Sequence, residues 1–299
     1  MAETTGTIDF TYNGEKFQTW YKVVGDLKAA RPLVTLHGGP GIPHNYMLPH
    51  AELATAGGIP VVFYDQIGIS HSTHLRDKPA TFWTVELFVA ELENVLTHLG
   101  IASDFDLLGH SWGGMLAAEY AIRVHSAGLK HLILTDSLAS MELWEVSVHK
   151  LFKQLAEDLQ ETLRKHEEDG TTDSKEYQEG VAVFYGKHVC RLDPWPQDLQ
   201  DAFALMGEDP TVYTTMVGPS EFNITGTLKT WSVIDKLHTI KYPTLVMNGV
   251  YDEAQDVCVR PFFEHIRKVK WVQFAESSHM PFFEEKERYL GVVEDFLKL

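Results

Sequence analysis

Cysteine and positive charge are both scarce in this chain of 299 residues. The two cysteines, Cys190 and Cys258, lack the spacing to other Cys or His residues that a zinc site requires, and two are too few for a disulfide framework. The 25 Lys and Arg residues face 42 Asp and Glu residues, which gives a formal net charge of -17 at pH 7. Phosphate groups would be repelled, so we expect no nucleic-acid partner and no anionic membrane as partner.

Long hydrophobic runs and targeting segments are also absent from the sequence. The N-terminus has neither a basic stretch nor an apolar stretch of the kind found in secretory signals, and no segment approaches the length of a membrane span. We therefore expect a soluble, cytoplasmic protein, and no pattern indicates an obligatory protein partner.

Short apolar runs alternate with segments long enough to form helices. Two runs around Asn13-Gly14, at 7–12 and 17–25, predict an antiparallel hairpin. The following runs predict buried parallel strands at 32–36, 60–64, 105–108, 129–134, 244–247 and 271–274. Helices are predicted between them, at 85–99, 115–121, 260–266 and 289–297. The pattern indicates an α/β protein with a mostly parallel sheet and helices on both faces.

The alternation disappears between about residues 140 and 234. Leucines recur every four residues and predict a first helix that ends in the acidic segment 167–173, and a second stripe resumes beyond it. The two stripes consist of Leu151, Leu155, Leu159 and Leu163, then Tyr177, Val181, Phe184 and His188. We expect them to pack against the core or each other rather than bind a partner. The predicted organisation is a core of residues 1–139 and 235–299 with an inserted helical cap at 140–234.

The segment Gly109-His110-Ser111-Trp112-Gly113 matches the G-x-S-x-G pattern between a predicted strand and a predicted helix. Glycine on both sides of Ser111 allows a tight turn that leaves the hydroxyl exposed. A strand, a sharp turn and a helix in this order form the nucleophile elbow of the α/β-hydrolase fold. We therefore predict that Ser111 attacks a carbonyl carbon.

A serine nucleophile needs a base and an acid that orients the base, and in this fold both follow it in the chain. Asp252 comes shortly after the predicted strand at 244–247, with Asp256 and Glu253 as nearby alternatives. His279 lies in a polar loop after the predicted strand at 271–274. We predict a catalytic triad of Ser111, His279 and Asp252.

Two backbone N–H groups are expected to stabilise the oxyanion of the reaction. One belongs to Trp112, directly after the nucleophile. The other is expected in the loop His37-Gly38-Gly39-Pro40-Gly41, where Gly39 is our choice and Gly38 a near alternative. This chemistry requires no metal ion and no organic cofactor, and we predict none.

Four motifs stand out in the sequence: the glycine loop at 37–41, Asp65-Gln66, the elbow at 109–114 and Tyr251-Asp252-Glu253. Together they resemble the proline iminopeptidase (prolyl aminopeptidase) family of α/β-hydrolases, including its fungal members and the archaeal tricorn-associated aminopeptidase. The resemblance covers essentially the whole chain and implies the same triad. It also implies that Glu221 in the cap and Glu253 hold the free α-amino group of a substrate. One departure stands out, because many bacterial members have Asp-Gln-Arg-Gly-x-Gly-x-Ser where residues 65–72 here lack the arginine and the second glycine.

These observations predict a serine hydrolase that releases an N-terminal residue, proline or another small apolar amino acid, from short peptides, amino-acid amides or arylamides. An esterase, lactonase or amidase acting on a small molecule or natural product is the alternative. A third hypothesis is a ligand-binding protein that keeps the hydrolase fold without turnover.

Overall fold

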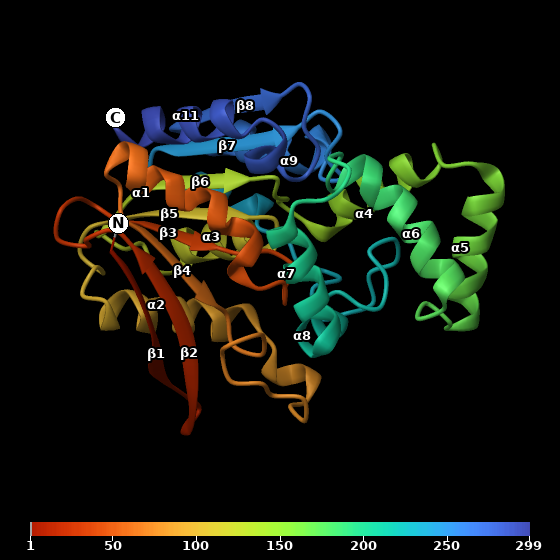
Figure 1. The fold of residues 1–299 in the computed structure, drawn as a ribbon, viewed down its shortest axis with the longest axis horizontal. Helices are drawn as coiled ribbons and strands as arrows, with labels where there is room; N and C mark the ends of the chain where they lie inside the picture. The colour runs from red at the N-terminus through yellow and green to blue at the C-terminus, as the bar shows by residue number, and fades with distance from the viewer. Residues whose placement is uncertain (1) are drawn as a thin grey trace.

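Eight strands form one sheet in the computed structural model, which describes residues 2–299 (Figure 1). Their order across the sheet is β1-β2-β4-β3-β5-β6-β7-β8. The hairpin strands β1 and β2 are antiparallel to each other, β2 is antiparallel to β4, and all later pairs are parallel. The strands are β1 (Glu3–Tyr12), β2 (Glu15–Val24), β3 (Leu33–Leu36), β4 (Val61–Asp65), β5 (Phe105–His110), β6 (Leu129–Thr135), β7 (Thr244–Gly249) and β8 (Val269–Phe274). The predicted fold class is confirmed.

Successive residues of the central strands enter two separate hydrophobic cores, because side chains alternate between the faces of a sheet. On β4, Val62 belongs to the core beneath α2 and α3, whereas Val61 and Phe63 belong to the core beneath α1 and α11. The helices that flank the sheet are α1 (Glu52–Gly57), α2 (Val85–His98), α3 (Trp112–Arg123), α9 (Asp256–His265), α10 (Pro281–Glu284) and α11 (Lys286–Leu297). Three short 3-10 helices complete the core: η1 (His44–Ala51), η2 (Ala80–Phe82) and η3 (Ile234–Thr239).

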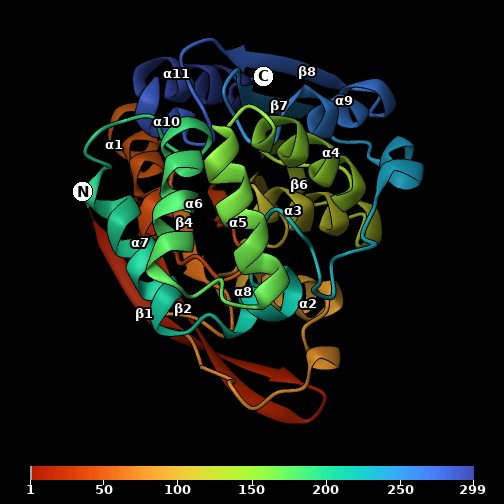
Figure 2. The same cartoon turned by 90° about the vertical axis from the view of Figure 1, so that its right-hand side faces the viewer.

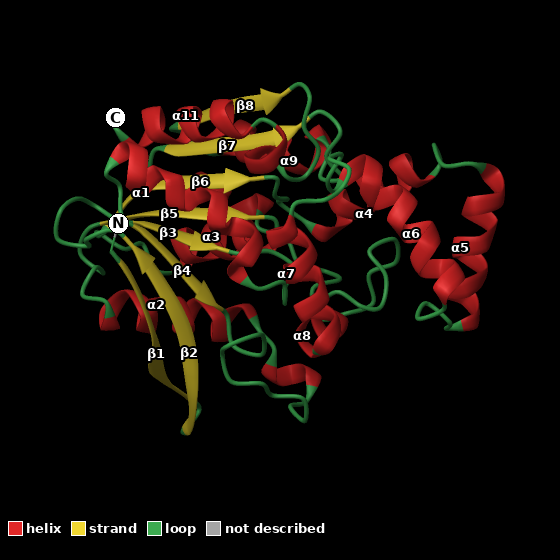
Figure 3. Cartoon of the chain, in the orientation of Figure 1, coloured by secondary structure: helices red, strands yellow, loops and turns green. Residues whose placement is uncertain are grey.

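Five further helices, which we call the cap helices, lie beyond the carboxyl ends of the parallel strands (Figures 1 and 3). They are α4 (Met141–Phe152), α5 (Glu157–Asp169), α6 (Lys175–His188), α7 (Gln197–Glu208) and α8 (Thr211–Met216). Figure 2 looks onto this side, with α5 and α6 nearest the viewer. The carboxyl end of a parallel sheet is where ligands bind in α/β proteins, so the cap helices cover the expected position of a site.

The prediction of one continuous helix through the first leucine stripe is wrong. The N–H groups of Gln154 and Leu155 bond back to the carbonyl oxygens of Leu151 and Phe152, and Ala156 is extended, so the chain turns between α4 and α5. Leu155 stays buried within the turn, which preserves the four-residue repeat and conceals the break. The second stripe lies on α6 and all four of its residues are buried, which confirms the expectation that it packs internally.

One helix boundary and the composition of the chain can also be compared with the structure. Helix α9 begins at Asp256, before the predicted start at residue 260, and contains Pro261. Both cysteines are buried, and neither forms a disulfide bond. Among residues 2–299, no helix combines the length and the apolar character needed to cross a membrane.

Asp209 joins the cap helices to the core directly before α8. His74 Nδ1 and Arg76 Nε, from the loop after β4, lie 2.5 Å and 3.0 Å from Asp209 Oδ2, and the Thr211 hydroxyl donates to Oδ1 at 2.6 Å. Burial would raise the pKa of Asp209, but the hydrogen bonds from Thr211, His74 and Arg76 lower it to about 2. The carboxylate is therefore ionised at neutral pH and fixes the start of α8 against the core.

Candidate active site

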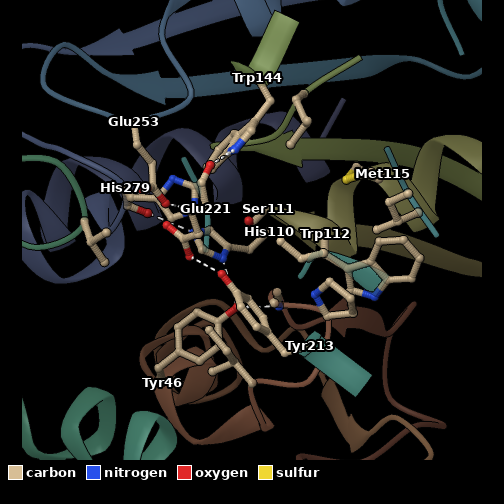
Figure 4. Close-up of a pocket in the computed structure, with 18 of the residues that line it drawn as sticks. Tyr46, His110, Ser111, Trp112, Met115, Trp144, Tyr213, Glu221, Glu253 and His279 are labelled. Atoms are coloured by element: carbon tan, nitrogen blue, oxygen red, sulfur yellow. Dashed lines mark hydrogen bonds and ion pairs between the residues drawn. The ribbon is translucent and has the colours of Figure 1, made fainter. Parts of the chain in front are cut away.

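Ser111 lies at the tip of a strained turn between β5 and α3. Its φ of 54° and ψ of −121° are rare for a residue with a side chain, and it is the N-cap of α3 without a capping hydrogen bond from its hydroxyl. Its carbonyl oxygen accepts a hydrogen bond from Ser137 Oγ at 2.9 Å, which ties the turn to the end of β6. The hydroxyl is therefore free for chemistry, and Figure 4 shows it facing the cleft.

The glycines of the elbow are required by close packing. A Cβ on Gly109 would overlap the carbonyl oxygen of Gly113, and one on Gly113 would overlap the carbonyl oxygen of Leu36. Strand β5, helix α3 and the end of β3 thus approach more closely than any side chain allows. This approach places Ser111 directly beside the glycine loop that follows β3.

His279 and Asp252 form a hydrogen-bonded pair at the same edge of the sheet. His279 Nδ1 lies 2.6 Å from Asp252 Oδ1, which also accepts the N–H of Ala254 at 2.8 Å. Both side chains are buried. Burial lowers the pKa of His279, opposed by nearby carboxylates, so the imidazole is neutral and able to accept a proton at neutral pH. His279 and Ser111 line the same cleft.

A neighbouring histidine fixes the backbone of His279. His110 Nε2 donates to the carbonyl oxygen of His279 at 2.8 Å, and its Nδ1 accepts from the Tyr46 hydroxyl at 2.9 Å. Burial lowers the pKa of His110 well below its usual value, so this ring is neutral and can play both roles. The residue directly before Ser111 therefore positions the loop that carries His279.

The N–H groups of Gly39 and of Trp112, the first residue of α3, are among the backbone donors near Ser111 that have no hydrogen-bond acceptor within residues 2–299. Gly38, the near alternative, donates its N–H to the Tyr46 hydroxyl at 2.6 Å. Gly39 has a φ of +106°, and a Cβ there would lie 2.6 Å from the backbone nitrogen of Gly41. The arrangement leaves Gly39 and Trp112 available for an oxyanion.

Hydrogen bonds from the Asp65-Gln66 segment hold the glycine loop against the elbow. Gln66 Oε1 accepts from Trp112 Nε1 at 2.9 Å, and the N–H of Gln66 donates to His37 Nε2 at 3.0 Å. This segment departs from the family pattern at two positions, Ile67 in place of the arginine and Ser70 in place of the second glycine, and both residues fit the local structure. Ile67 is fully buried, and Ser70 has a φ of 49° at the position where many relatives have glycine.

Glu221 and Glu253 converge on the side of the cleft where His279 lies (Figure 4). Glu253 Oε1 is 3.8 Å from His279 Nε2, and Glu221 Oε1 accepts from the Tyr213 hydroxyl at 2.7 Å. Among the described residues, the second oxygen of each glutamate is buried and has no hydrogen-bond partner. Burial, followed by the charges of Glu221 and Asp252, raises the pKa of Glu253 well above its usual value. The site therefore favours a cation that would satisfy both carboxylates.

The cleft lies between the core and the cap helices. The cleft is otherwise lined largely by apolar side chains, which include Met115, Leu138, Met141, Trp144, Val217 and Leu228. A ligand with a positive charge and a small apolar side chain fits this combination, with its carbonyl group beside Ser111.

Asp256, one alternative for the acid, has different contacts. Its Oδ1 accepts from Asn248 Nδ2 at 3.1 Å and from Gln273 Nε2 at 2.6 Å. Glu253, the other alternative, reaches His279 through Nε2 instead of Nδ1. Of the three acids, Asp252 is the one hydrogen-bonded to Nδ1 of His279.

Sequence reasoning missed Asp136, a buried acid directly after β6. Asp136, Asp252 and His279 form the one group within residues 2–299 whose possible metal-ligating atoms lie within 4.8 Å of one another. His279 is hydrogen-bonded to Asp252, and we assign no metal to the three residues. The sequence signal that could have identified Asp136 is the position of an acid at the carboxyl end of a predicted strand.

Tyr46 and Tyr213 were also missed, because they reach the cleft from helices whose packing the sequence does not show.

Comparison with known proteins gives consistent matches over nearly the whole chain. The model of the alpha/beta hydrolase fold family matches residues 31–286. The proline iminopeptidase of Heyndrickxia coagulans is 37% identical over 295 residues, which cover 98% of this chain and 98% of the relative. The solved structure of the proline iminopeptidase of Mycobacterium smegmatis is 43% identical, with a TM-score of 0.90 over 99% of this chain and 98% of that chain. The solved structure of VinJ is 46% identical, with a TM-score of 0.94 over 98% of both chains.

Proposed function

This chain belongs to the proline iminopeptidase family of α/β-hydrolases, and on that premise we propose that it is a serine aminopeptidase acting on short peptides and amino-acid amides. The residue released is proline or another small apolar amino acid with a free amino group. We keep the cytoplasmic location predicted from the sequence as part of this proposal.

In the proposed mechanism, His279 accepts the proton of Ser111 as the serine oxygen attacks the carbonyl carbon. Asp252 remains ionised, holds the ring through Nδ1 and stabilises the imidazolium. The N–H groups of Gly39 and Trp112 bind the oxyanion. His279 then donates the proton to the leaving amine, and a water molecule hydrolyses the acyl-enzyme by the reverse sequence.

The observation that carries the aminopeptidase assignment is the pair of unpartnered carboxylate oxygens on Glu221 and Glu253. A buried carboxylate without a partner is costly, whereas a bound ammonium provides hydrogen bonds and an opposite charge. Because Glu253 lies beside Nε2 of His279, an ammonium held there would be adjacent to the reacting carbonyl group. In an N-terminal residue, the α-amino group and the carbonyl group are likewise adjacent, since both are bonded to the same Cα atom.

The test compares L-prolyl and L-alanyl 4-nitroanilides with their N-acetylated forms and with 4-nitrophenyl butyrate. We expect cleavage of the free-amine arylamides and its loss on acetylation. Preference for the acetylated compounds or for the ester would refute the aminopeptidase assignment and favour the esterase or amidase alternative.

A second test examines the nucleophile. Ser111→Ala is expected to abolish turnover and fluorophosphonate labelling, whereas Ser126→Ala, a substitution in the loop between α3 and β6, should leave both unchanged. EDTA should leave the activity intact. Full activity in Ser111→Ala, or loss of wild-type activity in EDTA, would contradict the mechanism.

A further inference from the structure

Asp136 follows the last residue of β6 and is fully buried. Its φ is 49°, a left-handed conformation that Asp, Asn and Gly tolerate better than other residues. Its Oδ1 accepts the N–H of Gly249 at 3.2 Å, and its Oδ2 accepts the Thr135 hydroxyl at 2.7 Å. These two bonds hold the carboxyl group within 4.8 Å of the Asp252–His279 pair.

Asp252 has one oxygen that the proposed triad does not use. Oδ1 binds His279 Nδ1 and the N–H of Ala254, whereas Oδ2 is buried and receives no bond from an N–H or hydroxyl group of residues 2–299. The carboxyl group of Asp136 lies in the same group of atoms within 4.8 Å. If Asp136 carried a proton, it would be the donor that Oδ2 lacks.

The surroundings favour that proton. No Lys or Arg in the described residues pairs with either carboxyl group, and the other titratable groups that interact with them are His279, Tyr46, Tyr289, Glu253, Glu284, Asp256 and Cys258. Burial, then the negative charge of Asp252, raises the pKa of Asp136 well above its usual value. Burial, with smaller effects from the charges of Glu284 and Asp256, also raises the pKa of Asp252 well above its usual value, although hydrogen bonds from Asp136 and from the N–H of Ala254 oppose the shift. Two neighbouring buried carboxyl groups share one proton, and because Asp252 already accepts hydrogen bonds from His279 Nδ1 and from the N–H of Ala254, which favour its ionised form, we place the proton on Asp136.

We propose that Asp136 is a positioning residue that remains a neutral carboxylic acid and donates its proton to Oδ2 of Asp252. This inference rests on the triad of the proposed function and adds a fourth member to it. The bond fixes the plane of the Asp252 carboxylate, so that Oδ1 is aligned with Nδ1 of His279. It also keeps Asp252 ionised while His279 cycles between its neutral and protonated forms.

The proton balance is simple. One proton moves from Ser111 to His279 and then to the leaving amine, while the proton of Asp136 stays on Asp136 throughout. Asp136 touches neither the substrate nor the reacting atoms, so its effect must be transmitted through Asp252.

Two substitutions suited to a positive φ provide the test. Asp136→Asn keeps a donor, because one amide N–H can bond to Asp252 and the other to the Thr135 hydroxyl, which can also accept. Asp136→Gly removes the donor without backbone strain. Asp106→Asn is the matched control, since Asp106 is a buried acid 2.8 Å from His131 near the amino ends of β5 and β6, away from the cleft.

We expect Asp136→Gly to lower kcat about 10- to 100-fold, the size of a lost hydrogen bond to a charged group, with KM changed about twofold or less. Asp136→Asn should stay within about threefold of the wild type, with the acid limb of its pH profile unmoved. The downfield NMR resonance of the His279 Nδ1 proton should persist in Asp136→Asn and weaken in Asp136→Gly. Asp106→Asn should change none of these readouts.

Three outcomes would overturn the proposal. If Asp136 is ionised, Asp136→Asn shifts the acid limb to lower pH, because a negative charge near His279 has been removed. If donation is unimportant, Asp136→Gly keeps the wild-type kcat; if the asparagine donor does not rescue, Asp136→Asn loses as much as glycine. Should Asp136→Gly fail to fold, the pH profile and NMR spectrum of Asp136→Asn decide alone.

Failure of the proposed function is distinguishable from failure of this inference. An inactive wild-type protein refutes the function, yet the NMR resonance of His279 would still report on Asp136. An active wild type with unaffected Asp136 variants refutes the inference alone.

Discussion

Glu253→Gln removes one of the two carboxylates that we propose hold the substrate's ammonium group, while it keeps the shape of the side chain. Glu253 is only 4% exposed, so solvent and salt screen its charge weakly. Loss of one partner from a buried, hydrogen-bonded charge pair costs about 2–5 kcal/mol. Because Glu221 remains, with one oxygen already bonded to Tyr213, we expect the lower part of this range.

A loss of about 2–3 kcal/mol corresponds to a decrease of about 30- to 150-fold in kcat/KM. The decrease should be seen with L-prolyl 4-nitroanilide, whose amino group is charged. The uncharged ester 4-nitrophenyl butyrate should be hydrolysed at the wild-type rate or faster, because it makes no use of the carboxylate. Steady-state kinetics on both substrates, with wild-type and variant enzyme, separate amine recognition from an effect on the base.

Stability provides a second readout of the same substitution. The pKa of Glu253 is raised in the folded protein, so protonated Glu253 contributes to the free energy of unfolding at low pH. This contribution is lost as the pH rises through the pKa that Glu253 has in the folded protein. Glutamine carries no charge, so Glu253→Gln should melt at a higher temperature than the wild type at pH 8, with a smaller gain at pH 5.

The reasoning would be refuted by an equal loss on the ester and the arylamide, which would show that Glu253 acts on His279 and not on the amine. It would also be refuted by unchanged kcat/KM for the arylamide. A lower melting temperature at pH 8 would contradict the argument that the carboxylate is destabilising in the free enzyme.

Three further predictions concern the base, the elbow and the attachment of the cap helices. Burial lowers the pKa of His279, so the acid limb of kcat/KM for an uncharged ester should have its midpoint below pH 6.5, and a midpoint above that value would contradict it. Gly113→Ala places a methyl group against the carbonyl oxygen of Leu36 and should lower the melting temperature by about 3 °C or more in circular dichroism, so an unchanged melt would exclude this packing. Asp209→Asn weakens the hydrogen bonds that anchor α8, the helix that carries Tyr213. It should raise KM for the arylamide about fivefold with little change for the ester. Equal changes on both substrates would disprove the link between this anchor and amine recognition.

The local parts of the site could be predicted from the sequence because each has a strong local signal. Glycines mark the position of Ser111 in the sequence. In the structure these glycines lie so close to the backbone of α3 and β3 that a side chain would not fit. Asp252 and His279 follow apolar strands that proved to be β7 and β8. In a parallel sheet, residues that follow neighbouring strands meet at one edge, so order along the chain already indicated proximity.

The cap was less predictable because its helices are defined by packing and not by the sheet's alternation. The leucine repeat continued through the turn at residues 153–156, since the buried side of that turn is also apolar. The positions of Glu221 and Tyr213 relative to His279 depend on how α8 and the following loop dock on the core, for which no short-range signal exists.

The sequence by itself determined the sheet, the elbow and the order of nucleophile, acid and base, because strand alternation and glycine turns are local properties. Only the tertiary structure decided that the N–H of Gly38 bonds to the Tyr46 hydroxyl and is therefore taken. It also decided that Glu221 and Glu253 each keep an oxygen without a partner, and that Asp136 lies beside Asp252. Those facts depend on burial and on contacts between distant segments. Burial, in turn, sets which of these groups carry a charge, and therefore what the cleft can bind.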